Sequence, residues 1–257
     1  MLNRFAQSAG CEGLLRSATG MRSCLRIAMT AVLLATLTGC QNLSAGMPAA
    51  QVRIIDTSAD APELDVYQGG SALAYNLGFG TVSSYVSVTP GTSAVSAHAA
   101  GTKPPLSSVQ GSFAASGHYT VLIGGGPTGA VSETLLVDQS VSAPAGLASV
   151  RVVAQARRAA GDVDVYLVRA GSTLGESRPV MTNVGFGENG DYMNVPAGAY
   201  RVILVTAGTA VPVYSGATVA YASGSARTLI VLDSQRIDGQ KVQIVTAEDF
   251  DPAAVVE

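Results

Sequence analysis

The chain has 257 residues, of which 47% are apolar and only 13% charged, so it has ample material for a core and a length that allows one or two domains. Glycine is abundant, tryptophan is absent, and runs of Val, Thr, Ser and Ala favour short strands over helices. Residues 1–39 carry four arginines and one glutamate, whereas the remainder carries 11 basic and 17 acidic residues. An acidic body without clustered Lys and Arg argues against nucleic acid as a partner.

The chain begins with an export signal. Residues 27–37 form an uncharged apolar run that is too short for a membrane-spanning helix, which needs about 20 residues, but has the length of a signal-peptide core. Arg22 and Arg26 precede this run, and the segment 37–40, Leu-Thr-Gly-Cys, follows it and resembles the lipobox of bacterial lipoproteins. The resemblance implies cleavage before Cys40, a diacylglycerol on its thiol and acylation of the new amine, which together anchor a protein stably.

This signal sets the expected location of the protein. We predict a signal peptide over 1–39, with translation starting at Met21, because residues from Met21 onward already form a complete signal. Gln41 follows the cysteine, and the absence of Asp there resembles outer-membrane sorting in Gram-negative bacteria. The predicted location is therefore the cell envelope, lipid-anchored, at the outer membrane if the source is Gram-negative. An ordinary signal peptide with an incidental cysteine and a buried core helix are the alternatives.

All three cysteines lie at or before position 40. The part of the chain after Cys40 therefore has no disulfide, no thiol nucleophile and no cysteine ligand for zinc.

The rest of the chain contains the same unit twice. Five sequence blocks recur in the same order, which indicates two related domains. The paired blocks are 52–55 with 150–153, 65–67 with 164–166, 76–80 with 183–187, 85–91 with 192–198, and 115–123 with 222–231.

Each copy is predicted to be an all-β domain of the immunoglobulin-like or transthyretin-like sandwich type. Apolar and polar residues alternate over 64–67, and turn residues separate several such short segments. Pro196, Ala197 and Gly198 predict a tight hairpin, and Phe79 and Phe186 are expected to fill the cores. The predicted layout is a lipidated tether over 40–49, sandwich domains over 50–141 and 149–250 joined by a linker over 142–148, and a tail over 251–257.

The repeated blocks resemble a known family. The patterns V-R-[IV]-[IV], D-V-Y, N-x-G-F-G and Y-x-x-V-x-x-G, once per copy over residues 50–250, are similar to the bacterial domain-of-unknown-function family 4397. Residues 56–62 are close to the family's H-A-S-P-D-A-P, but Asp56 replaces the histidine and Ala59 the proline, and the second copy has lost this stretch. The resemblance implies secreted or surface-attached β domains without an established activity.

Four carboxylates are the best candidates for a metal site. Asp56, Asp60, Glu63 and Asp65 are close in sequence and carry the oxygen ligands that Ca²⁺ prefers. Their spacing is not that of an EF-hand, so we predict a solvated turn and keep calcium only as a weak alternative. No other cofactor is expected.

Two tyrosines are candidates for ligand contact. Tyr67 and Tyr166 occupy the outward face of equivalent strands, where an amphipathic ring contacts a sugar or a protein. Cover for a neighbouring strand is the alternative for both.

Catalysis is not expected. His98 and His118 are the two histidines, and no G-x-S-x-G motif accompanies them. The sequence therefore predicts a non-catalytic, lipid-anchored envelope protein that serves as a binding or structural module. Its expected partners are the membrane, through Cys40, and an envelope protein or glycan. A carbohydrate- or matrix-binding adhesin-like lipoprotein is the alternative.

Overall fold

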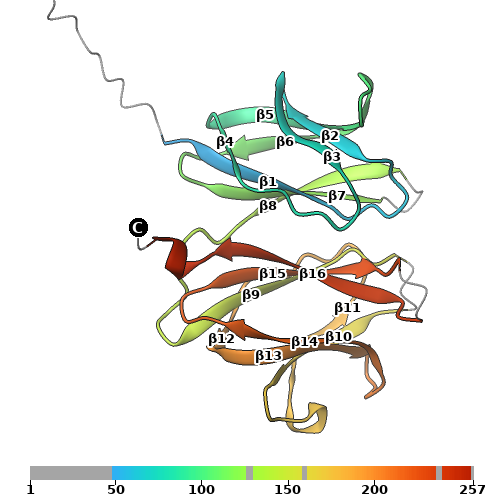
Figure 1. Ribbon diagram of the computed structural model, residues 1–257, viewed down its shortest axis with the longest axis vertical. Coiled ribbons are helices and arrows are strands. Elements are labelled where there is room, and N and C mark those ends of the chain that lie inside the picture. The colour runs from blue at the N-terminus through green and yellow to red at the C-terminus, as the bar shows by residue number, and fades with distance from the viewer. Residues whose placement is uncertain (1–47, 126–129, 158–160, 236–238, 256–257) are drawn as a thin grey trace, which may run out of the picture. The chain divides into compact units, whose positions relative to one another are not determined.

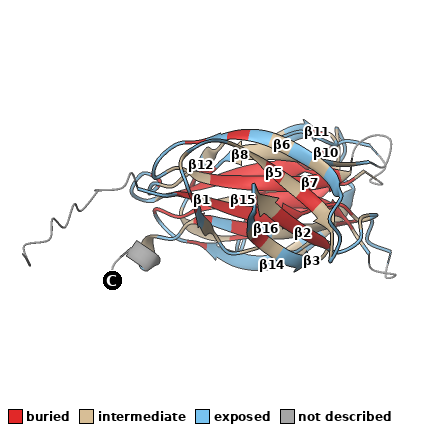
Figure 2. Ribbon diagram, turned by 90° about the horizontal axis from the view of Figure 1, so that it is seen from above, coloured by how far each residue is buried: buried red, intermediate tan, exposed pale blue. Residues whose placement is uncertain are grey.

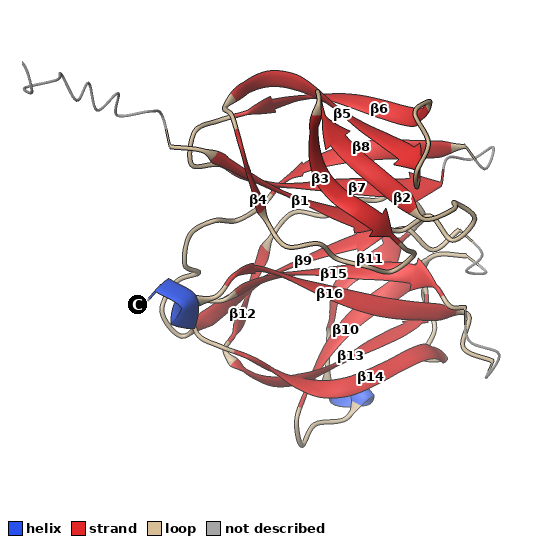
Figure 3. Cartoon of the chain, turned by 45° about the horizontal axis from the view of Figure 1, so that its top comes forward, coloured by secondary structure: helices blue, strands red, loops and turns tan. Residues whose placement is uncertain are grey.

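In the described part of the chain almost all of the regular secondary structure is β-strand (Figure 3). The computed structural model describes residues 48–125, 130–157, 161–235 and 239–255. These ranges contain sixteen strands and two short 3-10 helices, η1 (Leu174–Glu176) and η2 (Pro252–Val255). The predicted all-β class with two tandem sandwiches is confirmed, and both sandwiches belong to a single compact unit, residues 47–257.

The first sandwich has two four-stranded sheets, with strand orders β4-β1-β7-β8 and β3-β2-β5-β6 (Figure 1). The central strands β1 and β7 run parallel, and the other neighbours are antiparallel. The strands are β1 (Ala50–Asp56), β2 (Leu64–Gln68), β3 (Ser71–Leu77), β4 (Val86–Val88), β5 (Gly91–Ala99), β6 (Pro105–Phe113), β7 (His118–Gly125) and β8 (Val131–Val137).

The second sandwich repeats this topology, with strand orders β12-β9-β15-β16 and β11-β10-β13-β14. Each strand from β9 to β16 takes the place of the strand eight numbers before it, including the parallel central pair, β9 with β15. The strands are β9 (Leu147–Ala154), β10 (Val163–Arg169), β11 (Pro179–Val184), β12 (Met193–Pro196), β13 (Gly198–Thr206), β14 (Pro212–Tyr221), β15 (Ala226–Asp233) and β16 (Val242–Phe250).

Strand β1 is buried on both faces. Val52 and Ile54 point into the core between the two sheets, while Arg53 and Ile55 lie on the opposite face and are also buried. In Figure 2 buried residues fill the central strands, whereas edge strand β14 is mostly exposed. A strand that is buried on both faces needs a second layer of protein against its outer side.

That second layer is the other sandwich. One apolar cluster contains equivalent residues of both copies, Ile55 with Val153 and Leu122 with Ile230, all at most 1% exposed. Burying a side chain of this size contributes about 1.5–3 kcal/mol relative to leaving it exposed. The sheets that contain β1 and β9 are therefore joined by a dry apolar contact.

Two local predictions are wrong. The turn at 196–198 is not a hairpin, because β12 pairs with β9 while β13 pairs with β10 and β14. These turn residues instead carry the chain from one sheet of the sandwich to the other. Phe186 does not fill a core, since 42% of its surface is exposed, and Phe79 packs partly buried in the cluster that joins the sandwiches.

The segment between the sandwiches is held against the second one. The amide of Ala143 donates to the carbonyl of Gly224 at 2.9 Å, and the amide of Gly146 donates to the Ser223 hydroxyl at 2.8 Å. Backbone groups paired in this way restrict the linker.

The second copy is longer than the first between β10 and β11, and these extra residues cover an apolar patch. They contain η1, where the Glu176 carboxylate accepts the Thr173 amide at 2.8 Å. Leu174 packs against buried Val168, Ile203 and Val205 on the outer face of the sheet that contains β10. The insertion therefore supplies the second layer that this face needs.

The leader, Cys40 and most of the tether lie outside the described residues. Of the residues that are described, none belongs to a helix long and apolar enough to cross a membrane.

Candidate functional site

The four carboxylates that were considered for calcium do not form one ligand set. Asp56 and Asp65 are buried, whereas Asp60 and Glu63 are exposed. Among the described residues, no group of three or more His, Cys, Asp and Glu side chains is arranged to hold a metal ion.

Asp65 has a structural role that explains two of the repeated motifs. Its two oxygens accept the backbone amides of Gly101 at 2.9 Å and Asn76 at 3.0 Å, and these bonds lower the pKa of the carboxyl. Asn76 has a φ of 46°, in the left-handed region, so the carboxylate fixes an otherwise unfavourable turn. Asp164 makes the same two kinds of contact in the second copy.

The two candidate tyrosines have different surroundings. Tyr67 is half-buried, with its ring edge-on to His98 at 5.2 Å and to Tyr75 at 6.0 Å. Tyr166 is half-buried within the apolar cluster beside Leu174. Ligand contact by either ring stays a prediction.

His98 belongs to a serine–histidine pair without a carboxylate. Its Nε2 lies 2.9 Å from the Ser96 hydroxyl, and its Nδ1 lies 2.8 Å from the carbonyl oxygen of Lys103. The nearest cross-strand carboxylate, Asp65, already accepts two backbone amides. His118 lies 5.0 Å from the Tyr85 ring and takes part in no such pair.

A cluster of buried polar side chains lies between the sandwiches, and we call it the crossed network. The sequence alone did not predict it. Its two arginines pair across the joint: Arg53 of the first copy with Asp249, and Arg151 of the second copy with Asp138 at 2.6 Å. All four side chains are at most 5% exposed. The crossed network consists of Arg53, Tyr85, Thr120, Asp138, Arg151, Tyr192, Thr228 and Asp249.

The two halves of the crossed network are equivalent. Asp138 accepts the hydroxyls of Tyr85 and Thr120 from its own sandwich, at 2.8 and 2.6 Å. Asp249 accepts the corresponding Tyr192 and Thr228, each at 2.8 Å. The second oxygen of each carboxylate takes the arginine of the other sandwich, as in an interface with two-fold symmetry.

Each of the three guanidinium nitrogens of Arg53 donates a hydrogen bond. Nε of Arg53 donates to Thr120 at 2.8 Å, and Nη1 donates to the Glu248 carbonyl at 2.7 Å. Its guanidinium carbon lies 4.9 Å from the centre of the Tyr85 ring. Burial disfavours the charge on Arg53, but Asp249 and Asp138 outweigh it and raise the arginine pKa. Burial raises the pKa of Asp249, and Arg53 offsets this only in part. The two side chains are nevertheless in direct hydrogen-bond contact, so the crossed network is suited to holding the sandwiches together.

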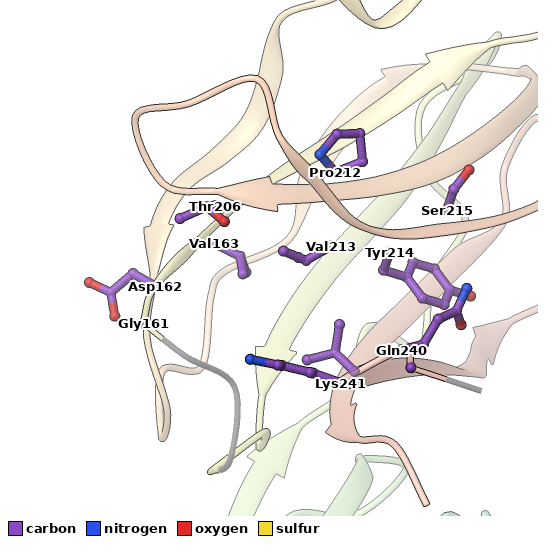
Figure 4. A pocket seen from close by; sticks show the side chains of 12 residues that line it. Gly161, Asp162, Val163, Thr206, Pro212, Val213, Tyr214, Ser215, Gln240 and Lys241 are labelled. Atoms are coloured by element: carbon purple, nitrogen blue, oxygen red, sulfur yellow. The ribbon is translucent and has the colours of Figure 1, made fainter. Parts of the chain in front are cut away.

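The candidate binding site is a cleft of about 630 Å³ at one open side of the second sandwich, between edge strands β14 and β16 (Figure 4). Its apolar floor includes Val163 and Val242, which belong to the second core. Pockets of about 300–1,000 Å³ with an apolar lining and a few polar groups are typical of ligand sites.

Polar groups stand around this floor. In Figure 4 the Lys241 side chain extends along the cleft toward the end where Asp162 lies, while Tyr214 and Gln240 lie at the other end. Tyr214 is half-buried, and burial raises the pKa of its hydroxyl above the ordinary value. The described lining residues include no nucleophile beside a general base, and their chemistry suits binding.

The first sandwich is closed at the equivalent place. There Glu133 of β8 reaches the other sheet, where its carboxylate accepts the amide of Ala97 at 3.1 Å. Its counterpart in β16, by strand pairing, is Ile244, which cannot make this bond. The two copies therefore differ at this edge of the sandwich.

The comparisons with known proteins match a family model to part of the chain and give no activity. The model of the family "Domain of unknown function (DUF4397)" matches residues 50–166, which span the first sandwich and run through β9 into β10. No curated protein sequence matches the chain. One solved structure similar to it is the crystal structure of CBMbc (family CBM26) from Eubacterium rectale Amy13K in complex with maltoheptaose. That similarity has a TM-score of 0.25 at 11% identity, covering 79% of this chain and 98% of the other, and is too low to bear on the ligand.

Proposed function

We propose, from the premise that residues 50–166 belong to the DUF4397 family, that the chain is a non-catalytic binding module held to the cell envelope by lipid on Cys40. The observation that carries the proposal is the cleft in the second sandwich, which has a ligand-sized volume and hydrogen-bonding groups, with no nucleophile–base pair among its described lining residues. The crossed network supports it, because its buried ion pairs join the sandwich that carries the cleft to the other sandwich.

We also propose that the second sandwich is a second copy of the same domain, although the family match ends within β10. Both sandwiches have the same strand order. Arg151 and Asp164 make the same contacts as Arg53 and Asp65 of the first copy. The repeated sequence blocks and these shared contacts therefore both support the duplication of one domain.

A carbohydrate- or matrix-binding adhesin is the second candidate function. The favouring observation is the aromatic patch on the first sandwich, where Tyr75 is 64% exposed beside Tyr67 and His98. Aromatic rings with a polar tip are well suited to sugars and to protein surfaces.

The anchor is tested by replacing Cys40. We expect the wild-type chain, produced in its source bacterium, to incorporate an alkyne-labelled fatty acid and to sediment with membranes. The Cys40→Ala variant has no thiol for the lipid, so it is expected to lose the label and to leave the membrane fraction.

Cys24→Ala is the matched control, because it removes a thiol from the predicted signal peptide without touching the lipobox. Equal labelling of wild type and Cys40→Ala, or loss of label in Cys24→Ala alone, would contradict the anchor.

A further inference from the structure

We infer that the cleft of the second sandwich binds a linear, uncharged glycan, with Tyr214 as the platform on which one sugar ring stacks. This inference rests on the proposed function and names the ligand class of its site. Its support comes from the shape of the cleft, from its charge and from the position of Tyr214.

The shape of the cleft fits a chain-like ligand. A second hollow of about 370 Å³ continues from the cleft along β14 and β16, and both are lined by Tyr214, Ser215 and Gln240. Gln243 and Ile244 line the extension. The cleft and this extension together form one groove. A groove of this kind accommodates several linked units rather than one compact molecule.

The charge of the groove fits an uncharged, hydroxyl-rich ligand. Its described lining has one carboxylate, Asp162, and one ammonium, Lys241. The other polar groups are amides and hydroxyls, which both donate and accept hydrogen bonds. An anionic or cationic polymer would need an excess of one sign of charge, which the described lining does not provide.

Tyr214 has the position that a stacking platform requires. Its ring lies over Gly216, where a Cβ atom would come within 3.0 Å of the tyrosine hydroxyl oxygen. A larger residue at 216 would therefore require the ring to shift by a few tenths of an ångström. The ring is half-buried, so one part packs on the protein while the rest faces the groove (Figure 4).

A peptide added as an extra strand fits this edge less well. Strand β14 begins at Pro212, which has no amide hydrogen to donate. Its register with β13 also shifts twice, between Arg201 and Ile203 and between Leu204 and Val205. Proline and bulges both interrupt the regular ladder that strand addition needs.

The test uses the full chain carrying Cys40→Ala, which removes the lipid but leaves the described residues unchanged. Cello-, malto- and chito-oligosaccharides are the neutral probes, an oligogalacturonate is the acidic probe, and unstructured peptides are the third class. We expect at least one neutral series to bind by calorimetry and to shift the NMR signals of the Tyr214 ring, with affinity rising with chain length. Tyr214→Ala is expected to weaken this binding by about tenfold or more, whereas Tyr214→Phe, which keeps the ring, retains most of it.

Val219→Ala, which removes an exposed side chain of the same strand outside both hollows, is the matched control and is expected to leave binding unchanged. An unaltered melting temperature of Tyr214→Ala establishes that the variant is folded. Binding of the acidic glycan or of peptides alone, no binding of any neutral glycan, or equal affinity of wild type and Tyr214→Ala would each overturn the inference. These outcomes leave the fatty-acid labelling of Cys40 untouched, so the two proposals fail separately.

Discussion

Asp138→Ala is expected to lower the free energy of unfolding by about 3–5 kcal/mol, because it leaves the buried Arg151 guanidinium without its carboxylate. The arginine lies 2.6 Å from Asp138 Oδ1 and is 5% exposed, so water cannot replace the lost partner. The hydroxyls of Tyr85 and Thr120 lose their acceptor as well. Since Arg151 and Asp138 belong to different sandwiches, the single unfolding transition expected of the wild type should become two in scanning calorimetry.

The control for Asp138→Ala is a charge pair at the surface. Glu248 lies 2.7 Å from Arg227, but its side chain is 51% exposed, so Glu248→Ala is expected to cost about 0–1 kcal/mol. The double variant Asp138→Leu with Arg151→Met, which removes both charges, is expected to be more stable than Asp138→Ala. Equal losses for Asp138→Ala and Glu248→Ala would show that the crossed network does not hold the sandwiches together.

The stability of the protein is expected to fall as the pH rises from about 4 to about 7, and Asp56 is the main cause. This carboxyl lies at the end of β1, 1% exposed, with one oxygen accepting the Ser58 amide and the other without a partner. Burial raises its pKa from 3.8 to about 7. Between these values the folded state holds a proton that the unfolded state releases, so each pH unit costs about 1.4 kcal/mol, up to about 4 kcal/mol in all.

Asp56→Asn removes this titrating proton, so it is expected to flatten the dependence of the free energy of unfolding on pH. Denaturant unfolding across the same pH range measures this dependence. In this variant Glu133, whose pKa is also raised by burial, is expected to leave a smaller fall of stability with rising pH. Glu63→Gln, which removes an exposed carboxylate from the same segment, is expected to keep the wild-type profile. A wild-type profile that is flat, or one that Asp56→Asn leaves unchanged, would contradict the role of Asp56.

The repeat and the strands could be predicted because their signals are local. The blocks at 65–67 and 76–80 recur because Asp65 fixes the left-handed turn at Asn76 in one copy and Asp164 does the same in the other. Alternation predicts a strand from neighbouring residues alone. It does not say which sheet a strand joins, and for this reason the residues at 196–198 alone predict a hairpin that does not form.

The crossed network and the cleft could not be predicted because they depend on distant partners. Arg53 and its acceptor Asp249 are 196 positions apart, and only folding of both copies brings them together. One signal was available: each copy has an arginine inside an otherwise apolar strand, and a buried charge requires a partner. The cleft is lined by residues of β10, β13, β14 and β16, which are far apart in the sequence. The copies also differ at this edge, with Glu133 in β8 against Ile244 in β16, and this difference appears only once the strands are paired.

The most direct test of the account is the mass of the N-terminal peptide of the mature protein, isolated from its source bacterium. We predict that this peptide begins at Cys40 and carries a thioether-linked diacylglycerol and an acylated amine. A mature chain that retains residues before Cys40, or a Cys40 without lipid, would contradict the claim that the two sandwiches are held to the envelope as a lipoprotein.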